Sequence, residues 1–276
     1  MGNKIVNDNS DKLQHLISSL NQDVVEMCQK MNLECGAVVV NHCEENREEE
    51  FEVNSHCVHV KHMNERGVGN SRNATMDMAT AELVLFSDED IRYETGYANR
   101  ISKEFSKHPE ADIILFNVRV DADRRTYENT DFHKIDWHNY GRYPAYSICA
   151  KNEALKKCSV KFSTLFGGGA PYSNGEDSLF LHDCLKAGLK IYSSPVWIGE
   201  EEKRPSTWFF GYNEKFFYDR GVLYPFLYGP LAVVFGLRFL LRNKGDMYGT
   251  ISRFKAFVLL CKGISKGNQL IRESRV

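Results

Sequence analysis

Short apolar runs alternate with helical segments along most of the chain, and this alternation constrains its fold more than any other feature. Gly36–Val40, Leu83–Phe86 and Ile113–Val118 are continuous apolar runs, typical of strands buried on both faces of a sheet. Ser71–Thr80 and Tyr93–Lys107 lie between such runs and are typical of helices. The pattern predicts an α/β fold, a mainly parallel sheet with helices on both faces. Ligands of such sheets bind beyond the carboxyl ends of the strands, so residues that follow a strand are the first candidates for chemistry.

Formal charge is distributed unevenly along the chain. The whole chain carries −2, which creates no field that attracts nucleic acid, so we expect no nucleic-acid partner. From Ser206 to the last residue there are 11 Lys or Arg and 4 Asp or Glu, a balance of +7 that leaves −9 for the rest. A basic end on an acidic body predicts contact with an anionic surface.

The basic end also contains two apolar segments, Gly221–Leu241 and Phe254–Ile264. The first is about as long as a membrane span, but two prolines and an arginine interrupt it. Its aromatic residues and basic flanks favour a segment that lies in the membrane interface. We therefore predict that residues 212–276 form an amphipathic helical extension in peripheral contact with an anionic membrane. The alternative is that the extension packs on the preceding domain.

Cysteine usage and the first residues of the chain bear on its compartment. The eight cysteines form no CxxC pair, and most lie in apolar runs, as buried free thiols do. The chain opens with the polar sequence MGNKIVNDNSDK, which lacks the apolar region of a signal peptide. We expect a reduced, cytoplasmic protein, with a peripheral position on the cytoplasmic face of the membrane.

Histidines and cysteines gather in one part of the sequence, and such residues bind zinc when they are suitably spaced. The group consists of His42, Cys43, His56, Cys57, His59 and His62. Its spacing matches no standard zinc finger, and His56, His59 and His62 would not share one face of a strand. We interpret the group as surface histidines.

Three consecutive acids, Asp88-Glu89-Asp90, directly follow a buried apolar run. Acids are depleted in strands, so propensity does not explain them. Alternate residues of an extended chain point the same way, so Asp88 and Asp90 can face one cation, and two carboxylates plus substrate phosphates are a usual site for Mg²⁺ or Mn²⁺. The alternative is a solvated loop, or acids that cap a following helix.

The region Asn64–Asp90 resembles family 2 glycosyltransferases. The family pattern is a glycine-containing loop, Arg-Asn at the opening of a helix, a small residue and an acid, a buried strand and DxD. The matching residues of this chain are Gly67, Gly69, Ser71, Arg72, Asn73, Ala81, Glu82 and Asp88–Asp90. The resemblance implies a GT-A, Rossmann-like catalytic domain over residues 12–211, followed by the extension 212–276.

The second half of the chain also resembles the family. Phe166–Phe180 reads FGGGAPYSNGEDSLF, which looks like a glycine-rich acceptor loop at Gly167, Gly168 and Gly169, then an acidic pair at a helix start. The resemblance assigns the catalytic base to Asp177 and acceptor orientation to Glu176. The alternative for the acids is a helix N-terminus, with Ser173 and Glu176 as a capping box.

Other parts of the resemblance concern the donor and the metal. Asn21 and Asn41 stand where the family places donor contacts at the ends of the first two strands, although the family has Asp at the second position. Many relatives have a late histidine as a third metal ligand; this chain has none after His182, so we expect a replacement, with Glu200 as candidate. The segment that contains Trp208 resembles bacterial capsule-type members and is assigned to the acceptor loop.

The resemblance implies a metal-dependent, inverting hexosyl or hexosaminyl transferase that works in surface polysaccharide synthesis. It would move a sugar from a nucleotide-sugar donor, a UDP-sugar, to a hydroxyl of a glycan or lipid-linked acceptor. Arg72 would contact the donor, at its nucleotide base or its phosphates. One alternative is a metal-dependent nucleotidyltransferase, but this needs an N-terminal phosphate loop and Asn7–Gln22 contains no glycine. The other alternative is a non-catalytic protein that binds a nucleotide sugar.

Overall fold

A 10-stranded sheet forms the centre of the computed structural model, which describes residues 12–122, 124–202, 211–242 and 251–273. The strands are β1 Leu13–Leu20, β2 Gly36–His42, β3 Arg47–Val53, β4 His56–Met63, β5 Leu83–Asp88, β6 Ile91–Tyr93, β7 Ile113–Arg119, β8 His133–Lys134, β9 Ile148–Lys151 and β10 Ile191–Glu201. Their order across the sheet is β3-β4-β2-β1-β5-β9-β7-β10-β6, and β8 pairs with β10.

The sheet is mixed rather than mainly parallel. β4, β2, β1 and β5 run parallel to one another, as the sequence predicts, and β7 and β10 form a second parallel pair. Between these groups β9 runs antiparallel to both β5 and β7. β3, β6 and β8 also pair antiparallel with their neighbours. The parallel part brings the ends of β1, β2 and β5 to one edge of the sheet.

Helices cover both faces of the sheet. They are α1 Val24–Lys30, α2 Val68–Met78, α3 Tyr97–Lys107, α4 Asn152–Cys158 and α5 Glu176–Lys186. Residues of α1 and α3 share a core with Ile17 and Leu85, while residues of α2, α4 and α5 share a second core with Leu16 and Val84. Successive residues of a strand thus enter opposite cores, which is why these strands are apolar at nearly every position.

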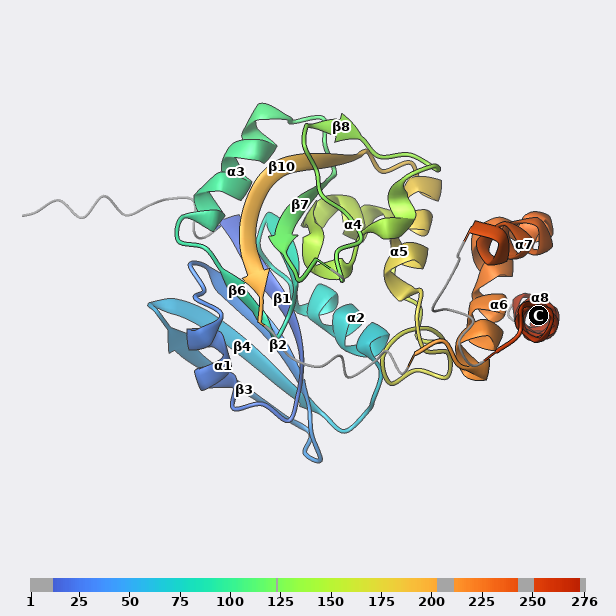
Figure 1. Cartoon of the computed structure of the whole chain (residues 1–276). Helices are drawn as coiled ribbons and strands as arrows, with labels where there is room; N and C mark the ends of the chain where they lie inside the picture. Colours follow the sequence, from blue (N-terminus) through green and yellow to red (C-terminus); the bar gives the residue numbers. More distant parts are fainter. Residues whose placement is uncertain (1–11, 123, 203–210, 243–250, 274–276) are drawn as a thin grey trace, which may run out of the picture.

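The C-terminal extension is helical, with α6 Glu214–Tyr228, a short turn of 3₁₀-helix at Gly229–Leu231, α7 Ala232–Arg242 and α8 Arg253–Glu273. These helices lie together at one side of the domain, beyond α5 (Figure 1). Glycines allow α6 and α8 to touch along their backbones: a Cβ atom at Gly263 would lie 2.1 Å from the Tyr218 carbonyl oxygen. Within the described residues, one helical stretch, Glu214–Arg242, is long and apolar enough to cross a membrane, judged by length and composition only.

The extension is fastened to the segment that precedes α5. Val222 and Leu223 of α6 form a small core with Phe166 and Leu179. Buried Asp219 accepts hydrogen bonds from the Ser173 backbone N–H at 2.9 Å and from its hydroxyl at 2.7 Å. The α6 helix therefore packs on the preceding domain, as the alternative interpretation of the sequence predicts.

Candidate active site

A cleft of about 750 Å³ opens at the carboxyl ends of β1, β2 and β5. Ser18–Leu20, His42 and Asp88 line it from these three strands. The backbone of Gly168–Gly169 and the first residues of α5 line it from the other side. The position agrees with the rule that α/β sheets bind ligands beyond the carboxyl ends of their strands.

Arg72 of α2 holds three carboxylates together at the floor of this cleft. Its guanidinium donates to Asp177 Oδ1 at 2.7 Å and to Asp88 Oδ1 at 3.1 Å, and lies 3.5 Å from Glu176 Oε1. The side chain is 6% exposed, and the Phe162 ring lies against the guanidinium, 5.2 Å from centroid to Cζ. The structure thus brings together four residues that the sequence singles out from positions up to 105 apart. In this structure the guanidinium positions acids, and its contact with the donor stays a prediction.

Close backbone approach explains the glycines of the site. Gly167 has a φ of +107°, and a Cβ atom there would lie 2.7 Å from the Glu176 carboxyl carbon. The Val68 N–H donates to the Gly168 carbonyl at 2.9 Å, so the loop before α2 is tied to the loop before α5. Any larger residue at 167 would push Glu176 out of its place, since a side chain there is both strained and obstructed.

Glu176 and Asp177, at the start of α5, both have raised pKa values. Burial, and next the charge of Asp177, raise the pKa of Glu176 to about 7. Burial also raises the pKa of Asp177, although Arg72 acts in the opposite direction. A helix N-terminus favours ionised acids, but the loss of hydration outweighs it here. Strongly perturbed acids in a cleft are typical of functional sites.

The capping box expected at the start of α5 is absent. The N-cap residue is Gly175, in the left-handed conformation, and it has no side chain to cap the helix. Ser173 instead donates its hydroxyl to Asp219 of α6. Glu176 and Asp177 are therefore held by Arg72 and the surrounding backbone.

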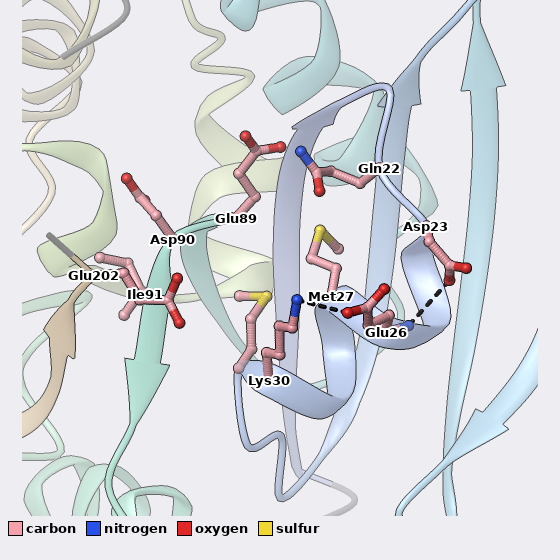
Figure 2. A pocket seen from close by; sticks show the side chains of 10 residues that line it. Gln22, Asp23, Glu26, Met27, Lys30, Glu89, Asp90, Ile91 and Glu202 are labelled. Atoms are coloured by element: carbon pink, nitrogen blue, oxygen red, sulfur yellow. Dashed lines mark hydrogen bonds and ion pairs between the residues drawn. The ribbon is translucent and has the colours of Figure 1, made fainter. Parts of the chain in front are cut away.

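Asp88, Glu89 and Asp90 all line the cleft: Asp88 ends β5, and Glu89 and Asp90 form the turn that joins β5 to β6. The Glu89 carboxylate accepts a hydrogen bond from the Leu20 N–H at 2.9 Å, which joins the ends of β1 and β5. Glu89 and Asp90 also line a second, smaller pocket of about 130 Å³, together with Gln22 and residues of α1. Figure 2 shows the side chains that line this pocket. The acids do not cap a following helix, because a strand follows them.

The acid that joins this group from the end of β10 is Glu201, not Glu200. Glu200 is exposed, whereas Glu201 lines the cleft with a side chain that is 8% exposed and bonds the Arg124 guanidinium at 2.7 Å. Burial, and next the charge of Asp90, raise the pKa of Glu201. Adjacent strand residues point to opposite faces, so an estimate that is off by one residue selects the wrong side chain.

Asn21 and Asn41, which the sequence analysis expects to contact the donor, do not line the cleft. Asn41 is buried and its amide is used locally: it accepts from the Gln22 N–H at 3.2 Å and donates to the Gln22 carbonyl at 3.0 Å. Asn21 is exposed and has a φ of +49°, a conformation that asparagine tolerates better than most residues. Both asparagines shape the turn after β1. Trp208 lies outside the described residues.

His42, at the end of β2, is a cleft residue that the sequence analysis does not assign to the site. It is buried, and neither ring nitrogen has a hydrogen-bond partner among the described residues. Burial lowers the pKa of His42, so the ring is neutral at physiological pH. Unpaired buried polar groups are rare and call for an explanation, and a ligand in the cleft is one. Its position directly after Asn41 is the signal that could have identified it.

The charges of the cleft favour a divalent cation. Six carboxylates and four arginines line it, so with every acid ionised the site carries two net negative charges. Oxygen ligands of this kind suit Mg²⁺ or Mn²⁺, and Asp88, Asp90 and Glu201 come from two adjoining chain segments. The chemistry of the donor set therefore fits a hard divalent ion.

Comparison with known proteins agrees with this arrangement. A family model described as Glycosyl transferase family 2 matches residues 37–168, a segment that contains Arg72, Asp88 and Asp90 but not α5. The matched segment, just under half of the chain, is similar to a family 2 glycosyltransferase domain. No curated protein matches the chain.

Solved structures share the fold. S. aureus TarS 1-349 in complex with UDP-GlcNAc has a TM-score of 0.55 and 16% identity, over 92% of this chain and 71% of that chain. The same TarS fragment in complex with UDP has a TM-score of 0.53, again with 16% identity and the same coverage. At this identity the likeness establishes the GT-A fold alone.

Proposed function

We propose that this glycosyltransferase transfers a sugar from a UDP-sugar to a hydroxyl of a glycan or lipid-linked acceptor, with inversion. The observation that carries the proposal is the convergence of Asp88, Glu176 and Asp177 on Arg72 at the floor of the cleft. These acids supply both a place for a cation and a base, which a transfer from a nucleoside diphosphate requires.

Asp88 and Asp90 would hold Mg²⁺ or Mn²⁺, with Glu201 as a third ligand in place of the late histidine of relatives. When bound, the ion neutralises the negative charge that develops on the departing diphosphate. Arg72 keeps Asp88 in place by its 3.1 Å contact. The net charge of the cleft, −2 with every acid ionised, supports this assignment, because a divalent cation offsets the repulsion between this charge and a diphosphate.

Asp177 would accept the proton of the acceptor hydroxyl, and Glu176 would orient that acceptor. The 2.7 Å contact with Arg72 favours the ionised form of Asp177, while burial keeps its basicity above that of an ordinary aspartate. A single base fits in-line displacement with inversion, and no covalent nucleophile is needed.

Donor and acceptor would enter the cleft from different sides. His42 would take the place of Asn41 as the polar contact to the nucleotide, because it lines the cleft at the end of β2, directly after Asn41. The backbone of Gly167–Gly169 would border the acceptor, together with the segment of Trp208. The capsule-like sequence around Trp208 supports a role in surface polysaccharide synthesis.

The C-terminal helices would bring the enzyme to the cytoplasmic face of an anionic membrane. Val234, Leu237 and Leu241 of α7 are 61%, 47% and 60% exposed and lie at helical spacing on one side of the helix. Arg238 and Arg242 of the same helix are exposed next to them. An exposed apolar stripe with basic neighbours is typical of an interfacial helix.

A donor screen tests the function. Thermal unfolding with Mn²⁺ and a panel of nucleotide sugars should single out a UDP-sugar, because a ligand at about 100 times its Kd stabilises the folded state by about 2.7 kcal/mol. Release of UDP on addition of an acceptor then separates a transferase from a binder. If no nucleotide sugar in the panel shifts the unfolding temperature, the proposed function is wrong.

A further inference from the structure

A group of potential metal ligands lies on the β3–β4 hairpin, apart from the cleft. Glu50 belongs to β3, the edge strand of the sheet, and Cys57 and His59 belong to β4. Their ligand atoms all lie within 4.8 Å of one another. In Figure 1 the hairpin lies at the far end of the sheet from α6–α8. The antiparallel register places Glu50 directly opposite His59, and Cys57 is two residues away on the same face.

The contacts within this group have the spacing of a coordination shell. The Cys57 Sγ atom lies 3.1 Å from Glu50 Oε1 and 3.3 Å from His59 Nε2. The His59 Nδ1 atom lies 3.1 Å from Glu50 Oε2. Ligand atoms at ordinary zinc bond lengths are roughly 3.3–3.6 Å apart when the geometry is tetrahedral. Cys57 and Glu50 contact different nitrogens of the His59 ring, so the side chains must rotate to place one atom of each residue around a single ion. The three ligand atoms already lie within 4.8 Å of one another.

We propose that Glu50, Cys57 and His59 form a Zn²⁺ site that clips the edge strand β3 to β4. A thiolate, an imidazole and a carboxylate are the ligand types that zinc accepts, and hard ions such as Mg²⁺ prefer sites without sulfur. Three protein ligands leave the fourth position to water. The site is independent of the proposed transfer reaction, since none of its residues lines the cleft.

Without metal, the Cys57 thiol donates a hydrogen bond to Glu50 Oε1 at 3.1 Å. An ion that binds the sulfur takes the place of this proton, which is released to solvent.

A neighbouring group on the same hairpin has similar residues but a different geometry. Cys43 Sγ lies 3.4 Å from His62 Nδ1, while Glu49 Oε1 lies 2.8 Å from His62 Nε2. Among the described residues, only Glu50, Cys57 and His59 offer one ligand atom each with all three atoms within 4.8 Å of one another, so Cys43, Glu49 and His62 do not form such a group. Cys43 is half-buried like Cys57, which makes it a matched control.

Cobalt titration of the full chain, purified with a chelator and a reductant, tests the site. Co²⁺ bound to a thiolate gives a sulfur-to-metal charge-transfer band in the near ultraviolet, which the carboxylates of the cleft cannot produce. We expect the band in the wild type and in Cys43→Ser, and its disappearance on addition of Zn²⁺. Cys57→Ser should lack it, and His59→Gln should bind Co²⁺ about 10-fold more weakly or worse.

Thermal unfolding gives a second readout that does not depend on the band. Zn²⁺ should raise the unfolding temperature of Asp88→Asn, in which the cleft site is weakened, but not that of Asp88→Asn combined with His59→Gln, which keeps the Cys57 thiol. A wild type without the band, a band that survives in Cys57→Ser, or one that vanishes in Cys43→Ser would overturn the proposal.

Discussion

Arg72 influences the protonation of the acids around it, because its one guanidinium forms ion pairs with Asp88, Glu176 and Asp177. A single positive charge cannot compensate three partly buried carboxylates, so the group favours either a proton or a further cation. This is the physical reason why burial leaves the pKa of Glu176 and of Asp177 above the ordinary range. The same imbalance prepares the site for a divalent ion and for removal of an acceptor proton.

Asp177→Asn tests the base. The amide keeps the size of the side chain and can still accept from Arg72, so the fold should persist. We expect sugar transfer to fall by about 10²–10⁴ while donor affinity stays near that of the wild type. Steady-state kinetics with donor calorimetry measure both, and Asp183→Asn, an exposed change on the same helix, is the matched control. Full transfer by Asp177→Asn together with inactive Glu176→Gln would reverse the two roles.

Glu176→Gln tests the cost of the buried acid. The pKa of Glu176 is about 7 in the folded protein, against about 4.3 when unfolded, so between these values the folded state binds more protons. The free energy of unfolding must therefore fall as pH rises through this window. In urea unfolding without divalent metal, the wild type should lose about 1–3 kcal/mol more than Glu176→Gln between pH 5 and pH 8. Parallel losses in the two proteins would mean that Glu176 is not an acid with a raised pKa.

His42→Ala tests the donor contact. A hydrogen bond to a charged ligand contributes about 1.5–3 kcal/mol, so we expect the Kd for the UDP-sugar to rise about 10-fold or more, with no loss of fold. Calorimetric titration measures this change. His108→Ala is the control, since His108 stacks on Phe132 and does not line the cleft. Equal donor affinity in both variants would remove His42 from the donor site.

At the scale of elements, the sequence predicts the parts of the fold that are locally encoded. Gly36–Val40 and Leu83–Phe86 are buried on both faces, and this makes them recognisable as strands. β3 is missed because its sequence, REEEFEV, places acids on an edge strand, where one face meets solvent. β9 is missed because it has four residues, too few for a periodic pattern.

The candidate site could be predicted only as a set of positions. Arg72, Asp88, Glu176 and Asp177 are visible in the sequence, but their common ion-pair network depends on long-range packing. Glu201 is missed by one residue because the exact phase of a strand decides which acid faces the cleft. The cluster at Glu50, Cys57 and His59 requires cross-strand register, and Glu50 belongs to the strand that the sequence does not reveal.

Substitutions on α7 test the membrane contact. Deletion after Gly221 is unsuitable, because it would cut α6 and remove Leu223 from the core beneath the site. Leu237→Glu should instead weaken binding to anionic vesicles about 10-fold or more, since a buried leucine contributes about 1.5–3 kcal/mol. Vesicle sedimentation measures this, with Val25→Glu on α1 as the control. A wild type that ignores anionic vesicles at low salt would contradict the peripheral-membrane proposal.

At the scale of the whole molecule, direct contacts connect the C-terminal extension to the catalytic cleft. Asp219 of α6 holds Ser173, three residues before Glu176, and Leu223 packs against Gly175 at the start of α5. A contact of α7 with a membrane would therefore be connected through α6 to the helix that carries the proposed base. The basic end and the acidic body, +7 against −9, would orient the cleft relative to an anionic surface.

The central claim is that Asp88 and Asp90 bind the donor through a divalent ion. Calorimetric titration of the UDP-sugar selected by the donor screen, with Mn²⁺ and again with chelator, tests it most directly in wild type, Asp88→Asn and Asp90→Asn. The account predicts donor binding by the wild type that needs Mn²⁺, and loss of this Mn²⁺-dependent binding in both variants, which keep their fold. Donor binding that is equally tight without metal, or equally stimulated by Mn²⁺ in both variants, would contradict it.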